Sequence, residues 1–265
     1  MAKNSSRFIV PAKKSPSGTA EHKKLSVIIP VAGMGHRMKS YGPKCLFPTS
    51  KNRTILERTL TNVKKVFPYS EIIVIVGFEA DKIIKTLPSY VRVVENQLYE
   101  QTNIVESLRL ALNNCIHDNV LIIHGDLIFN IYTLNDITSE GSCAIVDTQD
   151  RFGKNEIGVN IFDNKITNFS YGLSSKWAQI IYLTGNELDS FKNLCSQRDK
   201  NKMYMFEILN MVIDQKGSIQ AREPKGMQIV EIDSLKDLPN WESLYENYDI
   251  KRRTTRSFLY KNGVG

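Results

Sequence analysis

The sequence predicts an α/β protein, a three-layer sandwich around a mixed, mostly parallel central sheet. Short apolar runs without polar alternation recur along the first half of the 265-residue chain, as in strands buried on both faces of a sheet. Helical patterns separate these runs, and such alternation forms right-handed βαβ units. After Asn130 several strand patterns follow one another directly, which adds antiparallel strands to the C-terminal half.

The first half contains seven expected elements. Thr54 and Glu57 form a capping box, because the hydroxyl and the carboxylate each satisfy a free backbone amide of the first helical turn. Ile104, Leu108 and Ala111 form the apolar stripe of a second long helix. In order, we expect strand 25–31, helix 54–67, strand 71–76, helix 81–87, strand 91–95, helix 103–115 and strand 120–124.

The second half predicts antiparallel strands and three further helices. Asp163 and Asn164 suit the two central positions of a tight hairpin turn. Ser234 and Asp237 form a second capping box, which opens a final helix through about residue 246. The expected elements are strands 143–147, 158–163, 165–169 and 177–184, helices 187–195 and 204–215, and strands 219–222 and 228–232.

The positive charge of the chain belongs to its two ends. The net charge is +7, yet residues 1–24 and 251–265 each carry +5, so the body is acidic. We therefore expect a flexible basic arm over 1–24, one domain over 25–250 and a basic tail over 251–265, and we do not expect a nucleic-acid-binding protein. No apolar run approaches the ~20 residues that a membrane helix needs, so no membrane partner is expected.

The cysteines indicate the cellular compartment. Cys45, Cys115, Cys143 and Cys195 are widely spaced and form no C-x-x-C pair for zinc or redox chemistry. Isolated cysteines without an apolar secretion signal are typical of reduced thiols, so we expect a cytoplasmic protein.

A glycine-rich loop follows the first strand. Gly33 and Gly35 let the backbone approach a bulky anion, and their amides can face phosphate oxygens. Arg37 adds a forked cation and Lys44 a point charge. The loop is not a dinucleotide fingerprint, because Met38 stands where that motif needs Gly or Ala, and it is not a P-loop, because no G-K-[S/T] closes it. A plain turn with glycines for geometry is the alternative explanation.

The pattern A-G-x-G-x-R-M followed by P-K resembles the signature of nucleotidyltransferases that activate phosphorylated small molecules with an NTP. The resemblance implies a Rossmann-like (GT-A-like) fold and release of pyrophosphate. It places Ala32, Gly33, Gly35 and Arg37 around the triphosphate, and Lys44 across the reacting phosphates. His36 departs from the family pattern, which usually has Ser or Thr there.

Two aspartates follow strand ends. Asp126 comes after the strand at 120–124, and Asp233 after the one at 228–232. Ligands of open α/β sheets gather at the carboxyl ends of strands. The segment around Asp233 resembles the family's late E-I-D-[ST]-x-x-D-L motif, whose aspartate binds a metal together with the first one. Both residues are therefore candidate Mg²⁺ ligands, although an aspartate at a strand end is often only a turn residue.

Asn103 and Ser107 are candidate nucleotide-binding residues. The segment that contains them resembles the region near the nucleobase in the phosphocholine-cytidylyltransferase branch, which favours CTP or UTP as the substrate. The alternative is structural, with Asn103 as a helix N-cap and Ser107 as an ordinary helix residue.

The function expected from this resemblance is transfer of a nucleoside monophosphate from an NTP to a phosphorylated small molecule, a sugar phosphate or a phosphocholine-like compound. Tyr171, Trp177 and Lys176 are candidates for the acceptor side, with core packing or solvation as their alternatives. A glycosyltransferase of similar architecture is an alternative, but such enzymes normally carry a D-x-D motif. Here Gly125-Asp126-Leu127 lacks the first Asp of that motif. A regulatory nucleotide-binding module is a further alternative. A homo-oligomer is compatible with the sequence.

Overall fold

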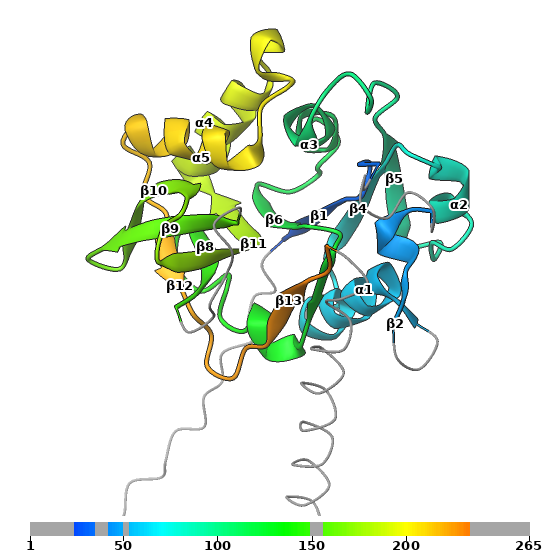
Figure 1. Ribbon diagram of the computed structural model, residues 1–265, viewed down its shortest axis with the longest axis horizontal. Helices are drawn as coiled ribbons and strands as arrows, with labels where there is room; N and C mark the ends of the chain where they lie inside the picture. The colour runs from blue at the N-terminus through cyan, green and yellow to red at the C-terminus, as the bar shows by residue number, and fades with distance from the viewer. Residues whose placement is uncertain (1–23, 35–41, 50–52, 149–155, 234–265) are drawn as a thin grey trace, which may run out of the picture.

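The computed structural model describes residues 24–34, 42–49, 53–148 and 156–233. Its central feature is a nine-stranded sheet with strand order β5-β4-β1-β6-β11-β8-β12-β10-β9 (Figure 1). The strands of this sheet are β1 (Ser26–Pro30), β4 (Glu71–Val76), β5 (Val91–Glu95), β6 (Asn119–Ile123), β8 (Cys143–Asp147), β9 (Ile157–Phe162), β10 (Lys165–Tyr171), β11 (Ser175–Thr184) and β12 (Gln220–Arg222).

The first half of the sheet is parallel, as its sequence predicts. Strands β5, β4, β1 and β6 pair in parallel, with Ile28 opposite Ile73 in the register of β1 and β4. Side chains alternate between two cores, because Val27 and Ile29 lie in one and Ile28 lies in the other. This alternation explains why the strand sequences are apolar throughout.

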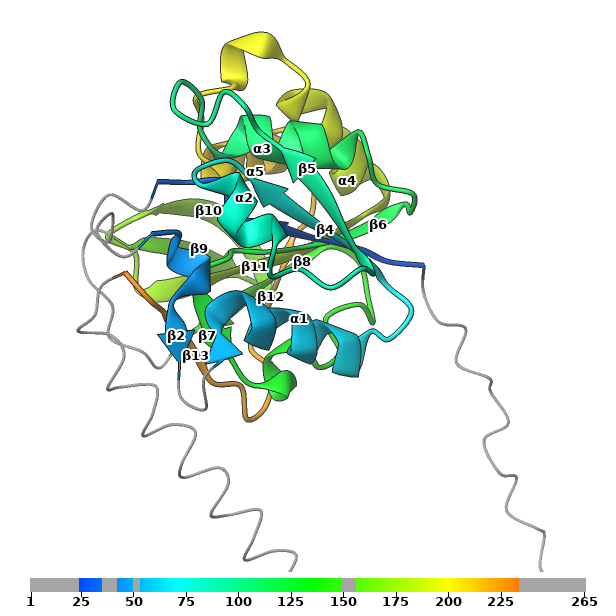
Figure 2. The ribbon, with the colours of Figure 1, turned by 90° about the vertical axis from the view of Figure 1, so that its right-hand side faces the viewer.

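Helices cover both faces of the sheet. Figures 1 and 2 show α3 (Ile104–Leu112), α4 (Gly185–Cys195) and α5 (Met205–Asp214) on one face, and α1 (Ile55–Val66) on the other. The short helix α2 (Ala80–Ile84) packs on the α1 side through Ile83. Helix α1 begins at the capping box predicted for Thr54 and Glu57. None of the helices in the described part of the chain has the length and apolar character that spanning a bilayer requires.

The second half of the sheet is largely antiparallel, as its sequence predicts, so the expectation of a mostly parallel sheet is wrong for the sheet as a whole. Five of the nine strand pairings in the sheet are antiparallel, and only β8 and β12 pair in parallel there. An additional pairing between β11 and β9 closes β11-β8-β12-β10-β9 into a ring. Strands β9 and β10 of this half form a hairpin whose two turn residues, Asp163 and Asn164, have φ of +49° and +59°, as a tight turn requires. The mixed α/β class with a central sheet is confirmed.

In the described part of the chain, two small sheets and three short 3₁₀ helices add to the expected elements, although β13 itself falls within the predicted strand 228–232. Strand β7 (Leu127–Phe129) pairs with β13 (Ile229–Glu231), and β2 (Pro48–Thr49) pairs with β3 (Arg53–Thr54). The 3₁₀ helices are η2 (Lys44–Leu46), η4 (Ile131–Leu134) and η5 (Arg198–Lys200). The predicted final helix, the two basic ends, Gly35 and Arg37 lie outside the described residues.

Candidate active site

A cavity of about 240 Å³ opens at the carboxyl ends of β1 and β6. This edge is where open α/β sheets bind ligands, and the sequence placed its glycine-rich loop and Asp126 there. The loop after β1, the loop after β6, the start of η2 and the segment before α3 supply the lining. The lining residues are Pro30, Val31, Ala32, Gly33, Lys44, Cys45, Asn96, Tyr99, Thr102, Asn103, Ile104, Ser107, His124, Gly125 and Asp126.

Lys44 joins the two predicted aspartates. Its Nζ lies 2.9 Å from Oδ2 of Asp126 and 2.8 Å from Oδ1 of Asp233, although 82 and 189 residues separate the partners in the chain. Side-chain exposure is 16% for Lys44, 24% for Asp126 and 41% for Asp233, so the ion pairs lie at the cavity wall rather than in open solvent. The structure thus brings together three residues that the sequence selected separately.

A third carboxylate completes an acidic cluster, which we define as Asp126, Glu231 and Asp233. One carboxylate oxygen from each lies within 4.8 Å of the others. Burial and the negative charges of the two aspartates together raise the pKa of Glu231 to about 7, although a hydrogen bond from Gln179 and the charge of Lys44 oppose them. Burial alone would lower the pKa of Lys44, but the charges and hydrogen bonds of both aspartates outweigh it and hold that pKa above its usual value. The site therefore concentrates negative charge that favours cations.

The backbone around Asp126 explains how the cluster forms. A Cβ on Gly125 would come within 2.2 Å of Cγ1 of Val31, so only glycine fits between the ends of β6 and β1. The amide of Ile232 donates to the carbonyl of Asp126 over 3.0 Å, at the end of the β7–β13 pair. This small sheet carries Asp233 next to Asp126.

The cluster fits a divalent cation. In proteins Mg²⁺ takes oxygen ligands, usually one or two carboxylates together with water and substrate phosphates, and this cluster offers three carboxylates. Oδ1 of Asp126 is buried and has no hydrogen-bond partner among the described residues, so this atom is available to a further cation. Nε2 of His124, which lines the same cavity, is likewise buried without a partner in the part of the chain that the structure describes.

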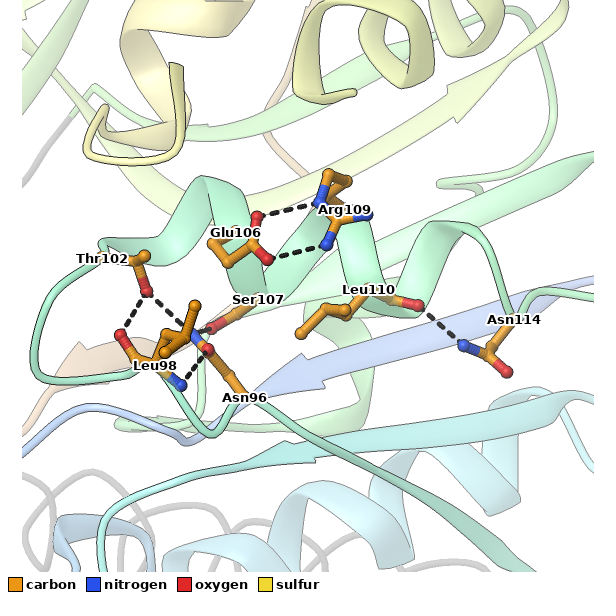
Figure 3. A network of polar contacts seen from close by, with 8 residues as sticks. All are labelled: Asn96, Leu98, Thr102, Glu106, Ser107, Arg109, Leu110 and Asn114. Carbon is orange, nitrogen blue, oxygen red and sulfur yellow. Dashed lines mark hydrogen bonds and ion pairs between the residues drawn. The ribbon is translucent and has the colours of Figure 1, made fainter. Parts of the chain in front are cut away.

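A polar network, shown in Figure 3, includes Asn96, Thr102 and Ser107, which also line the cavity. Nδ2 of Asn96 donates to Oγ of Ser107 over 3.0 Å and to Oγ1 of Thr102 over 3.1 Å, and Oδ1 accepts from the amide of Leu98. Asn96 and Ser107 are only 2% and 4% exposed. Asn103 is the N-cap of α3, since its side chain accepts from the amide of Ile104 over 2.8 Å. It also lines the cavity, so its capping and ligand-facing roles are compatible.

Ala32 and Gly33 line the cavity at the end of β1. The carbonyl of Ala32 accepts from the amide of Phe78 over 3.0 Å, which fixes the loop after β1 against the loop after β4. A Cβ on Gly33 would meet no described heavy atom within 4 Å, so the backbone there faces open space. Gly35 and Arg37, predicted for the same loop, lie outside the described residues.

Sequence reasoning missed several residues of the site. Glu231 stands two positions before Asp233 in the E-I-D pattern, so its place beside a strand end was a usable signal. Asn96 follows a predicted strand in the same way. His124 is the last residue of the predicted strand 120–124 and carried the same signal, whereas Tyr99 lies four residues beyond the strand at 91–95 and carried none. Of the acceptor candidates, Trp177 is 2% exposed and packs on Phe169 and His124, which is a core position.

Two solved structures with the same fold are nucleotidyltransferases. CTP:phosphocholine cytidylyltransferase (LicC) from Streptococcus pneumoniae superposes with a TM-score of 0.71 at 19% identity, over 84% of this chain and 99% of that one. Inositol-1-phosphate CTP transferase from T. maritima superposes with a TM-score of 0.68 at 17% identity, over 82% of this chain and 92% of that one. At these identities the similarity establishes the fold alone.

Sequence comparison gives closer relatives. The bifunctional protein GlmU of Lactococcus lactis subsp. lactis (strain IL1403) is 36% identical over 101 residues, and GlmU of Koribacter versatilis (strain Ellin345) is 32% identical over 108 residues. These matches cover 37% and 40% of the chain and 21% and 22% of the relatives, so the chain spans about a fifth of their length.

A family model covers the half of the chain that builds the cavity. The model describes IspD, 2-C-methyl-D-erythritol 4-phosphate cytidylyltransferase, and it matches residues 25–161, just over half of the chain. The matched segment contains Gly33, Lys44, Asn103, Ser107 and Asp126, all of which line the cavity. By its sequence and by its fold, the chain belongs to the IspD family of nucleotidyltransferases.

Proposed function

We propose that this protein transfers a nucleoside monophosphate from an NTP to a phosphorylated small molecule and releases pyrophosphate. The observation that carries the proposal is the meeting of Lys44, Asp126 and Asp233 beside a cavity that Lys44 and Asp126 line. A polyphosphate needs a cationic partner at this place, and a metal ion needs the carboxylates. Both requirements are met at the sheet edge where nucleotides bind in α/β folds.

The chemistry is an in-line displacement at the α-phosphorus. An oxygen of the acceptor phosphate forms a bond to the α-phosphorus, and the bond from that phosphorus to the bridging oxygen of the β-phosphate breaks. The electron pair of the broken bond leaves with pyrophosphate. The attacking oxygen is already an anion at neutral pH, so the reaction requires no general base, and catalysis consists of alignment and charge stabilisation.

Lys44 supplies a mobile positive charge for this step. In the structure its ammonium group neutralises Asp126 and Asp233. We propose that it exchanges these carboxylates for phosphate oxygens of the substrate, while Asp126, Asp233 and Glu231 hold Mg²⁺. Bound there, Mg²⁺ would neutralise the triphosphate and stabilise charge on the leaving pyrophosphate. Arg37, Gly35, Gly33 and the backbone at Ala32 are assigned to the triphosphate by the same resemblance.

The polar network at the cavity is the proposed base site. Asn96 holds the hydroxyl of Ser107 in place, and Asn103 lies at the start of the same helix. We expect CTP or UTP as the nucleotide, in keeping with the cytidylyltransferase family model and the two CTP-dependent structural neighbours. The Rossmann-like (GT-A-like) description and a cytoplasmic location, which suits the four free cysteines, belong to the same proposal.

The decisive experiment measures pyrophosphate release in the presence of Mg²⁺. Each of the four NTPs is combined with phosphocholine, a hexose 1-phosphate, inositol 1-phosphate and 2-C-methyl-D-erythritol 4-phosphate. Release that requires both one NTP and one phosphorylated acceptor supports the proposal, and the unphosphorylated acceptor is the matched control. Binding of NTP without release under all sixteen combinations would indicate a regulatory module instead.

A further inference from the structure

We infer that Gln179 is a positioning residue of the acidic cluster, which it holds in shape by tying Glu231 to the central sheet. The inference rests on the proposed function, because it assigns Gln179 to the metal site of that reaction. Gln179 lies in β11 and is not among the residues that line the cavity of the candidate active site. Its role follows from its backbone, from its hydrogen bonds and from the residues they connect.

The backbone of Gln179 is unusual for a residue inside a strand. Its φ is +56°, in the left-handed region that favours glycine. The register of β11 against β8 shifts between Trp177 and Ile181, so this residue lies in a β-bulge. Bulges beside active sites re-aim a side chain, and a non-glycine residue in this conformation is retained only where the surroundings stabilise it.

The re-aimed side chain reaches the acidic cluster. Nε2 of Gln179 donates to Oε2 of Glu231 over 2.5 Å. Glu231 belongs to the small β7–β13 sheet, whereas Gln179 belongs to the nine-stranded sheet, so this hydrogen bond links the two sheets. The carbonyl oxygen of Gln179 also accepts from the amide of His124 over 3.3 Å, next to the end of β6.

The two residues that Gln179 connects have equivalent places in the chain. His124 stands two positions before Asp126, and Glu231 stands two positions before Asp233. Gln179 therefore bridges the two strand ends that carry the aspartates, one through its backbone and the other through its side chain. Fixing these ends fixes the spacing of the carboxylates between them.

A neutral amide suits this task. Three carboxylates whose oxygens lie within 4.8 Å repel one another, and Glu231 is the one that the ion pairs of Lys44 leave out. A lysine in place of Gln179 would hold Glu231 but would also cancel charge that the metal requires. The amide holds Glu231 in the cluster and leaves its charge available to the cation.

The test replaces Gln179 by glycine, because glycine adopts the same φ without strain. Mn²⁺, a spectroscopic substitute for Mg²⁺, is titrated into nucleotide-free protein and followed by electron paramagnetic resonance. For Gln179→Gly we expect Mn²⁺ binding weakened at least about tenfold, as for other residues that orient metal ligands, with an unchanged thermal midpoint. Lys216→Gly is the matched control, since Lys216 also has a positive φ, +69°, but lies at the end of α5.

A double-mutant cycle with Glu231→Gln assigns the effect to the hydrogen bond. If Gln179 acts through Glu231, adding Gln179→Gly to Glu231→Gln should change Mn²⁺ affinity less than twofold. Unchanged affinity in Gln179→Gly, an equal loss in Lys216→Gly, or full additivity in the cycle would overturn the inference. If Mn²⁺ affinity depends on Gln179 but the wild-type protein releases no pyrophosphate, the proposed reaction is refuted and this inference still stands.

Discussion

Replacing Lys44 by methionine should change metal binding and catalysis in opposite directions. Methionine keeps the length and apolar stem of the side chain but removes the charge. In the nucleotide-free protein, the Lys44 ammonium neutralises Asp126 and Asp233, so a metal ion must compete with it for the same oxygens. Its removal should therefore strengthen divalent-metal binding, while the reaction loses a cation that stabilises the transferring phosphates.

The magnitude follows from the two ion pairs. Two unit charges 4 Å apart interact by about 4 kcal/mol at an effective dielectric constant near 20. The three side chains are between 16% and 41% exposed, so solvent screening reduces each pair to about 1 kcal/mol. Two such pairs amount to about 2 kcal/mol, roughly 30-fold in the dissociation constant of the metal. Loss of one contact to developing charge should lower turnover by about 100-fold or more.

Both effects can be measured on the same protein samples. Mn²⁺ titration without nucleotide gives the metal affinity, and pyrophosphate release with saturating Mg²⁺ gives kcat. Lys64→Met is the control, because the Lys64 ammonium binds two backbone carbonyls after α1, away from the cavity. Weaker Mn²⁺ binding in Lys44→Met would show that Lys44 does not compete with the metal, and an unchanged kcat would remove it from the reaction.

Three further predictions concern other parts of the molecule. Asp126→Asn and Asp233→Asn should each lower pyrophosphate release by more than about 100-fold with little change in the thermal midpoint; wild-type rates in either variant would refute the metal assignment. Gly125→Ala should destabilise the fold by about 1–3 kcal/mol in urea denaturation, because the new Cβ meets Val31 at 2.2 Å; a fully stable variant would contradict the close contact. Burial raises the pKa of the Glu71 carboxyl, but hydrogen bonds and an ion pair outweigh burial and hold that pKa below its ordinary value of 4.5. The stabilisation is therefore present above pH 4.5 and is lost as the pH falls through the lowered pKa. Glu71→Gln should cost about 1–3 kcal/mol at pH 7 and flatten the acid-induced loss of stability; parallel pH curves for variant and wild type would exclude this role.

The elements of the fold were largely readable from the sequence. The strand at Glu71–Val76 and the strand at Cys143–Asp147 have the predicted bounds, and helix α1 begins at the predicted capping box. These features are local, since burial on both faces or a cap requires a pattern within a few residues. The parallel pairing of the first half also follows, because βαβ units leave little choice of topology.

The pairing of the second half could not be read in the same way. The position of β12 between β8 and β10 depends on contacts between segments far apart in the chain, and so does the additional pairing of β9 with β11. The same holds for β7 and β13, which are three residues long and carry little periodicity of their own. Their pairing nevertheless decides where Asp233 lies.

By itself, the sequence determined the α/β class and the glycine-rich loop after the first strand, which rest on residue types at short spacings. Lys44, Asp126 and Asp233 became candidate site residues through these spacings together with the resemblance to nucleotidyltransferases. Only the tertiary structure decided that Lys44 joins both aspartates, that Glu231 completes the acidic cluster and that Gln179 holds it. These contacts join residues from separate elements of the fold, so their geometry exists only after the sheets have formed. Side-chain distances of a few ångströms are fixed by packing and not by sequence spacing.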